Sequence, residues 1–150
     1  MIQILFQVAA AGGLLAGTGD LPEPDPASGT PHRYSGVALD VEITTPSVPS
    51  ADIRVDGLID DRSWEHAAVL DGFTQFNPIE GSPASQETEV LVLVDDDALY
   101  FAVRAYDDDP SGIRATLSER DSFGFSDDYI RFILDTFDDQ RRAYVFTVNP

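Results

Sequence analysis

The chain has 150 residues, enough for one domain with a sizeable core, and 43% of them are hydrophobic, as in a globular protein. Its net charge is −18 at pH 7, its nine basic residues are all arginine, and it has no cysteine. This charge disfavours nucleic acid and anionic membrane surfaces as partners, and the missing cysteine excludes disulfides and thiol chemistry. One methionine and two widely separated histidines leave little to bind a transition metal or haem.

Residues 1–19 are predicted to be an export signal that sends the protein to the periplasm, the outer membrane or the medium. Residues 2–16 are apolar and uncharged, and residues 16–19 are small, as at a signal cleavage site. The basic flank that normally precedes such a segment is missing, so a buried helix of the domain is the alternative. Export is favoured because a proline-rich stretch follows directly, and the segment is short for a membrane span.

Residues 20–50 are predicted to be a flexible linker. Proline recurs there with glycine, serine, threonine and aspartate, a composition typical of extended, mobile chain. Residues 37–43 alternate between apolar and polar side chains and would fit one short strand within it.

The folded domain is predicted to span residues 51–150. Ile53 and Val55 are expected to begin a strand, and Asp56-Gly57 has the composition of a turn.

A short helix is expected next, capped by Asp60 or Asp61. Trp64, the only tryptophan, meets Ala67 and Ala68 at helical spacing. A lone exposed tryptophan would suit stacking against a sugar. The spacing to two alanines instead favours a place in the core, where the helix meets the sheet.

Two aromatic residues, Phe73 and Phe76, lie in a loop-rich segment that leads to the next strand. Beside the polar side chains of Gln75, Asn77 and Glu80, exposed rings would suit sugar binding, because a pyranose stacks on a ring while its hydroxyls need polar partners. Burial of the two rings as loop anchors is an equal alternative.

Residues 88–106 hold the pattern around which the domain is expected to be organised, two strands joined by an acidic turn. The first strand is apolar on both faces, which indicates a strand inside the protein. Asp95, Asp96 and Asp97 supply the turn, because short acidic side chains hydrogen-bond locally and tolerate turn dihedrals. One face of the return strand carries Leu99, Phe101, Val103 and Ala105, and the other carries Tyr100, Ala102, Arg104 and Tyr106.

The acidic residues 107–109 and the proline after them form a strong stop signal. Asp109 is expected to cap a short helix that begins at Pro110, with Ile113 and Leu117 on its inner face. Carboxylates are preferred ligands of calcium, but the run lacks the spaced oxygens of a calcium loop. A solvated turn is therefore favoured, with calcium binding as the alternative; no other cofactor is expected.

Residues 129–148 predict a second hairpin. Ile130, Phe132 and Leu134 alternate on the first strand, residues 135–142 turn the chain, and the return strand aligns Tyr144, Phe146 and Val148. Antiparallel strands at regular spacing with one or two short helices predict an all-β fold, an antiparallel β-sandwich of immunoglobulin or jelly-roll kind. A sandwich needs more strands than these to cover both faces. The chain is therefore expected to be the front part of a larger domain, incomplete at its C-terminus.

Three motifs in order carry a family resemblance: DGLIDDRSW, TEVLVLVDDDALYFAVRAYDDDP and SERDSFGFSDDYIRFILDTFDDQRRAYVFTVNP. Over residues 52–150 the chain resembles the family 9 carbohydrate-binding module, and most closely the exported bacterial variant that precedes a predicted outer-membrane β-barrel region. The resemblance implies a DOMON-like β-sandwich that binds sugar, often attached to enzymes that degrade polysaccharides.

The chain departs from the family at the sugar site. Characterised modules grip the ligand between two tryptophans, whereas Trp64 matches the signature position interpreted above as core. The rest of such a site would lie beyond Pro150, or sugar binding has been lost. Related sandwiches that hold haem through methionine and histidine are excluded, because Met1 is the only methionine.

The leading hypothesis is non-catalytic binding of a poly- or oligosaccharide, accessory to polysaccharide catabolism at the cell envelope. The candidate contacts are Tyr100, Arg104 and Tyr106, with Phe76, Glu119, Arg120 and Asp121 as rim. Arg104 would donate hydrogen bonds to vicinal hydroxyls while a tyrosine stacks beneath the ring. The alternative for Arg104 is an ion pair with a nearby carboxylate as structural support.

A structural domain and an enzyme are the two other hypotheses for the function. The second hypothesis is a structural, accessory N-terminal domain of an outer-membrane β-barrel protein, with no sugar ligand and with short alternating strands downstream. An enzyme is the weakest hypothesis, because the sequence has no Gly-x-Ser-x-Gly elbow, metal-ligand pair or phosphate loop. With 27 acidic residues, no pair of carboxylates can be singled out for glycoside hydrolysis.

Overall fold

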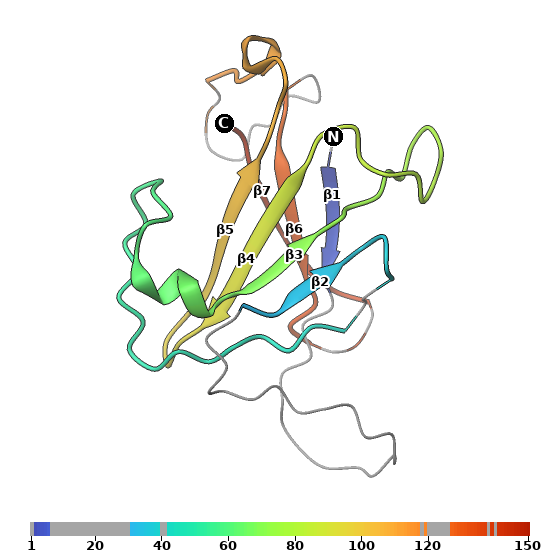
Figure 1. Ribbon diagram of the computed structural model, residues 1–150. Helices are drawn as coiled ribbons and strands as arrows, with labels where there is room; N and C mark the ends of the chain where they lie inside the picture. The colour runs from blue at the N-terminus through green and yellow to red at the C-terminus, as the bar shows by residue number, and fades with distance from the viewer. Residues whose placement is uncertain are drawn as a thin grey trace.

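The computed structural model is all-β (Figure 1). It describes residues 31–39, 42–117, 119, 127–137, 139 and 141–150, and the backbone of residues 2–6. The strands are β1 (Ile2–Phe6), β2 (Arg33–Ser35), β3 (Ala68–Asp71), β4 (Thr88–Val94), β5 (Leu99–Ala105), β6 (Ile130–Leu134) and β7 (Tyr144–Val148). Two short 3₁₀ helices, η1 (Arg62–His66) and η2 (Pro110–Gly112), complete the described elements.

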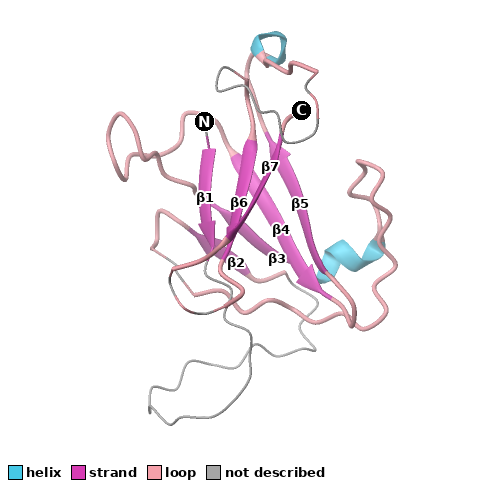
Figure 2. Ribbon diagram, turned by 180° about the vertical axis from the view of Figure 1, so that it is seen from behind, coloured by secondary structure: helices cyan, strands magenta, loops and turns pink. Residues whose placement is uncertain are grey.

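The strands form two sheets that lie one behind the other (Figure 2). One sheet has the order β2-β3-β4-β5, with β2 parallel to β3 and the other neighbours antiparallel. The second has the order β1-β6-β7, with β1 parallel to β6 and β6 antiparallel to β7. Both predicted hairpins, β4–β5 and β6–β7, are confirmed.

Strand β4 is apolar on both faces because each face packs against a different cluster. Val90 and Val92 belong to the inter-sheet core, whose buried members are Ala68, Leu70, Val90, Val92 and Phe132. Phe132 of β6 reaches this core from the second sheet, where its ring centroid lies 4.7 Å from that of Phe101 on β5. This contact holds the two sheets face to face.

The opposite face of the same sheet packs against a second cluster, here called the Trp64 cluster. Its buried members are Trp64, Ala67, Val69, Leu91, Leu93 and Ala102. Trp64 is 8% exposed, so its predicted place in the core is confirmed. Residues 51–67 thereby cover half of this face, with Ile53 and Ile59 as further contacts.

The segment before η1 differs from its prediction. Ile53 and Val55 form no strand, and Val55 is 93% exposed. The Asp61 carboxylate does not cap η1, because it accepts the Arg54 N–H at 3.0 Å and the Arg54 Nε at 3.4 Å. The predicted turn at Asp56 is confirmed, since its Oδ1 accepts the N–H of residue 58 at 3.0 Å.

Part of the predicted linker is bonded to the first sheet. Strand β2 pairs with β3. Strand β4 also bonds to this segment: the Val94 N–H donates to the Pro46 carbonyl at 3.0 Å, and the Val94 carbonyl accepts from the Val48 N–H at 2.8 Å. Residues 33–35, Pro46 and Val48 of the predicted linker thus bond to the first sheet. The linker as a whole and the domain boundary at residue 51 stay predictions.

Two other expectations about the first fifty residues concern the short strand over residues 37–43 and the export signal. The short strand over residues 37–43 is not formed at its start, because residues 36–39 are a turn in which Leu39 has a φ of 63°. Residues 2–6, within the predicted export signal, form β1. Residues 7–30 and 40–41 lie outside the described residues, and export stays a prediction.

Helix η2 also differs from its prediction. Ile113 is 41% exposed and Leu117 fully exposed, so neither lies on an inner face. The acidic residues before them form a turn, in which Asp107 accepts the N–H of Asp109 at 2.7 Å and Asp108 accepts from Gln86 Nε2 at 3.3 Å.

The acidic turn of the β4–β5 hairpin is confirmed and depends on Asp95. Its carboxylate accepts the N–H groups of Asp97 and Ala98 at 2.9 and 2.7 Å and the hydroxyl of Tyr100 at 3.1 Å. The bond from Asp97 does most to lower the pKa of Asp95; partial burial opposes it, and the bonds from Ala98 and Tyr100 lower the pKa further.

We expect the free energy of unfolding to decrease as the pH falls below 3.8, the ordinary pKa of this carboxyl group. Because the pKa is lower in the folded state, the contribution of Asp95 is complete above that value and is lost as the pH passes down through the folded pKa. Urea titrations between about pH 5 and pH 2 measure this slope. Asp95→Asn should make the slope shallower, and Asp96→Asn, at the exposed neighbour, should not. Equal slopes in all three proteins would contradict the assignment.

Candidate functional site

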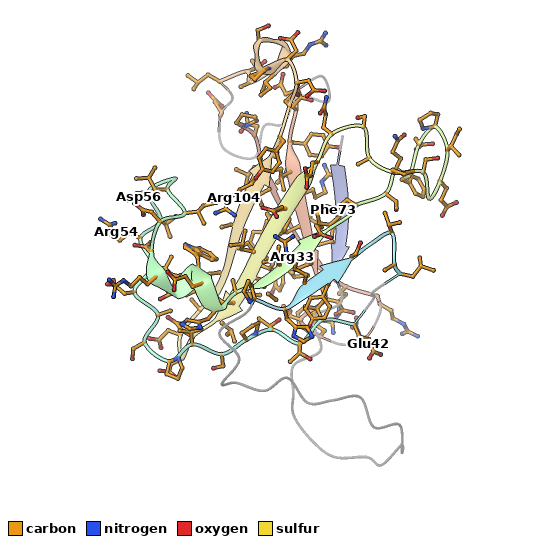
Figure 3. The ribbon with its side chains drawn as sticks, viewed as in Figure 1. Arg33, Glu42, Arg54, Asp56, Phe73 and Arg104 are labelled. Atoms are coloured by element: carbon orange, nitrogen blue, oxygen red, sulfur yellow. The ribbon has the colours of Figure 1, made fainter. Side chains whose placement is uncertain are left out.

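The face of the β2-β3-β4-β5 sheet that points away from β6 is here called the front face. One half of it lies under residues 51–67, through the Trp64 cluster. The other half is open and carries charged side chains. Figure 3 shows two of them, Arg33 and Arg104, on the same side of this sheet.

The open half holds a row of four charged residues, one from each strand: Arg33, Asp71, Glu89 and Arg104. Arg33 donates from Nη1 to Asp71 at 2.7 Å and from Nη2 to Glu89 at 3.0 Å. Arg104 lies directly opposite Glu89 in the β4–β5 register and approaches its second oxygen at 3.5 Å. This charged row therefore crosses the whole sheet, with Glu89 between the two guanidinium groups.

The central carboxylate of the charged row is mostly covered, whereas its two guanidinium groups are exposed to solvent. The Glu89 side chain is 13% exposed, whereas those of Arg33 and Arg104 are 58% and 41% exposed. The hydrogen bond to Asp71, and then that to Glu89, raises the pKa of Arg33. Each guanidinium has five N–H donors, so both arginines retain donors that point to solvent.

Tyr106 extends this surface beyond the end of β5. Its N–H donates to the carbonyl of Glu87 at 2.9 Å, so strand pairing continues one residue past Ala105. Because side chains two residues apart share a face, Tyr106 lies on the same face as Arg104. It is 50% exposed and makes no ring contact within the described part of the chain.

The predicted loop aromatics have different environments. Phe73 packs against the inter-sheet core and is a loop anchor, whereas Phe76 is 69% exposed. Backbone bonds from Ala84 to Phe73 and from Gln75 to Ser82 make the loop a tight hairpin that projects to one side of the molecule (Figure 1).

The structure separates the residues predicted to form one site. Tyr100 donates to Asp95 at the hairpin turn and packs against the Trp64 cluster, and its pKa is raised first by burial and then by that bond. It lies six residues from Tyr106, about 20 Å along the strand. Tyr100 is thus a partly buried residue bound to the hairpin turn and the Trp64 cluster, and Arg104 and Tyr106 remain on the open half.

The rim residues are placed only in part. Glu119 is exposed, and Arg120 and Asp121 lie outside the described residues. The ion pair weighed as the alternative for Arg104 is present, with Glu89 as the carboxylate.

Sequence reasoning missed three members of the charged row. The composition around Arg33 predicts a linker, and the site predicted from the sequence includes neither Asp71 nor Glu89. One signal was available, because Glu89 is the only charged residue of β4, which pairs with the strand of Arg104.

A second exposed surface lies on β7 and the turn before it. The rings of Phe137 and Tyr144 stack with centroids 5.9 Å apart, and those of Tyr144 and Phe146 are 6.5 Å apart. The guanidinium of Arg142 lies 4.1 Å over the Phe137 ring. These three rings, here called the aromatic ridge, are each about half exposed.

Among the described residues, no group of three or more histidine, cysteine, aspartate or glutamate side chains is arranged to hold a metal ion. No helix in this part of the chain is long and apolar enough to cross a membrane.

Comparison with protein-family models, with curated proteins and with solved structures found no match to this chain. The family resemblance of the three motifs therefore stays a prediction.

Proposed function

We propose that the protein is a non-catalytic carbohydrate-binding domain, built as a DOMON-like β-sandwich and accessory to polysaccharide catabolism at the cell envelope. The predicted antiparallel arrangement holds for the β3-β4-β5 and β6-β7 pairings, whereas β2 and β1 each add to their sheet in parallel. The sugar binds on the open half of the front face. The observation that carries this proposal is the charged row beside Tyr106, in which two exposed guanidinium groups are fixed by a shared, largely covered carboxylate.

The charged row has the chemistry that sugar hydroxyls require. Arg33 and Arg104 donate through planar guanidinium groups, which suit two neighbouring oxygens. Asp71, 24% exposed, accepts hydrogen bonds from hydroxyl groups. Because strands carry these groups and ion pairs hold them, little side-chain freedom is lost when a ligand binds. Tyr106 supplies the apolar ring face against which the carbon skeleton of the sugar packs.

The charge of the surface selects a neutral sugar. Two arginines and two carboxylates cancel within the charged row, so it provides no net attraction for an anion. The chain as a whole carries a charge of −18 and repels anionic polysaccharides such as polygalacturonate. The substrate class is therefore a neutral hexose or pentose polymer.

Binding without catalysis is proposed because both carboxylates of the row act as acceptors from arginine. Hydrolysis of a glycoside requires one carboxyl group to serve as a proton donor to the leaving group.

Native gel electrophoresis through soluble polysaccharides tests the proposal. We expect xylan, mixed-linkage glucan or galactomannan to slow the wild-type protein, and polygalacturonate to have no such effect. Arg104→Ala should weaken binding about 10- to 100-fold, because hydrogen bonds from a charged donor contribute about 1.5–3 kcal/mol each. Tyr106→Ala should weaken binding as well.

The matched control is Arg54→Ala. Arg54 is also an exposed arginine with an ion pair, to Asp61, but it lies in the segment that covers the other half of the front face. This variant should keep the full retardation. Trp64 fluorescence would verify that each variant is folded. An Arg104→Ala protein that folds and keeps full affinity would remove the charged row from the proposal.

A second candidate function is a structural, accessory domain with no sugar ligand. The exposed apolar side chains of β7 favour it, because such surfaces usually contact another polypeptide. A folded wild-type protein that none of the neutral polysaccharides retards would support this candidate.

A further inference from the structure

The charged row runs across the strands of the first sheet and not along them. Asp71 lies opposite Ser35 in the β2–β3 register, and Glu89 lies opposite Arg104 in the β4–β5 register. The β3–β4 pairing, continued by one residue, places Asp71 beside Glu89. The row is therefore perpendicular to the strands, which lie about 4.8 Å from one another.

The two arginines occupy two separate positions in this row. Arg33 comes from β2 and Arg104 from β5, at opposite edges of the sheet (Figure 3). Arg33 bonds to one oxygen of Glu89 and Arg104 approaches the other, so this carboxylate separates the two guanidinium groups. One guanidinium spans two neighbouring hydroxyl oxygens of a single sugar unit. Two guanidinium groups on either side of a carboxylate therefore contact two different units.

Tyr106 assigns one of these units to the β5 end. It lies two residues after Arg104 on the same face, about 7 Å along the strand, and so beside the row. A ring in this position stacks against the same unit whose hydroxyls Arg104 bonds. The next unit then meets Arg33, which donates, and Asp71, which accepts.

Both ends of the row lie at edges of the sheet. Strands β2 and β5 are the outer strands, and within the described residues no strand pairs with the outer side of either. The side chains of Arg33 and Arg104 are also far more exposed than that of Glu89 between them. A site for a chain end is a concave pocket that encloses the last sugar unit. An exposed row between two edge strands instead lets a glycan chain continue past both ends.

We infer that the charged row binds the interior of a neutral polysaccharide chain, which lies across the strands from β5 to β2. Consecutive sugar units of an extended chain follow one another at about the spacing of neighbouring strands, roughly 5 Å. The first unit lies over Tyr106 and Arg104. The next unit lies over Arg33 and Asp71, and no free chain end is needed. This inference rests on the proposed function and adds which part of the chain is recognised.

Isothermal titration calorimetry of the whole chain with linear xylo-, cello- and manno-oligosaccharides tests the inference. We expect the affinity to rise about 10-fold or more from the monosaccharide to the trisaccharide, because the second guanidinium is engaged only by a second unit. The affinity should then level off toward the hexasaccharide. Borohydride reduction, which opens the ring at the reducing end, should leave the affinity for the hexasaccharide unchanged.

Two variants of Arg33 test its share of the site. Arg33→Ala should abolish the rise in affinity with chain length. Arg33→Lys keeps a positive charge beside Asp71 and should fold as the wild type does, but it lacks the planar pair of donors and should lose most of the rise. Arg54→Ala is again the matched control and should keep the wild-type dependence on length. Trp64 fluorescence would verify that each variant is folded.

Three outcomes would overturn the inference while the proposed function stands, because a sugar still binds in each. The first is loss of hexasaccharide binding after reduction of the chain end. The second is equal affinity for the monosaccharide and the trisaccharide. The third is a folded Arg33→Lys protein with an unchanged dependence on length. A wild-type protein that binds none of the oligosaccharides or polysaccharides would instead refute the proposed function, and this inference with it.

Discussion

Replacing Trp64 by alanine is expected to lower the free energy of unfolding by about 3–5 kcal/mol. Trp64 is 8% exposed and lies among Ala67, Leu91 and Leu93, so its removal leaves a cavity between η1 and β4. Domains of this size have only about 5–15 kcal/mol of stability in total. Urea unfolding followed by circular dichroism measures the loss, because the variant has no tryptophan to report by fluorescence.

Two variants distinguish this effect from a general effect of losing an aromatic ring. Phe76→Ala removes a ring that is 69% exposed and should change stability by less than about 0.5 kcal/mol. Trp64→Phe keeps most of the packing and removes an indole N–H that is buried without a partner in the described residues, so it should cost about 1–3 kcal/mol less than alanine. If Trp64→Ala were as stable as the wild type, residues 51–67 would not be anchored to the sheet as the structure shows.

The hairpins could be predicted because their signals are local. The alternation in β4 and β5 and the acidic residues between them specify two strands and their turn within nineteen residues, 88–106. Trp64 lies in the core as predicted, but only Ala67 of the two alanines joins its cluster. Ala68 begins β3 and faces the inter-sheet core, so the helical spacing gave the right burial with one wrong contact.

The candidate site could not be assembled in this way because its contacts are not local. Arg33 is 38 residues from Asp71 and 56 from Glu89, and the composition around it is typical of a linker. Only the pairing of β2 with β3 brings these side chains onto one face. A sequence pattern specifies that a strand forms but not which distant strand lies beside it.

For the same reason, the exposure of the apolar face of β7 could not be predicted from the sequence. The alternation of Tyr144, Phe146 and Val148 predicts a strand with an apolar face, and that strand is present. Whether this face is covered depends on the strands packed opposite it. In the described residues the inter-sheet core includes Phe132 of β6 but none of these three side chains.

Phe132→Ala is expected to be about as damaging as Trp64→Ala, with a loss of about 3–5 kcal/mol. Phe132 is 9% exposed, and its ring packs against Phe101 across the two sheets. Removing it leaves a cavity where the sheets meet. Urea unfolding followed by Trp64 fluorescence measures the change, because Trp64 lies on the other face of the first sheet and stays in place.

The chain supplies its own control for this prediction. Phe146 lies directly opposite Phe132 in the β6–β7 register and has the same side chain, but it is 53% exposed. Phe146→Ala should therefore cost less than about 1 kcal/mol. Because the same substitution is made at two directly paired positions, the difference between them reports chiefly the burial of Phe132 between the sheets. Equal losses would mean that the second sheet is held by strand pairing alone, and that Phe132 does not join it to the first.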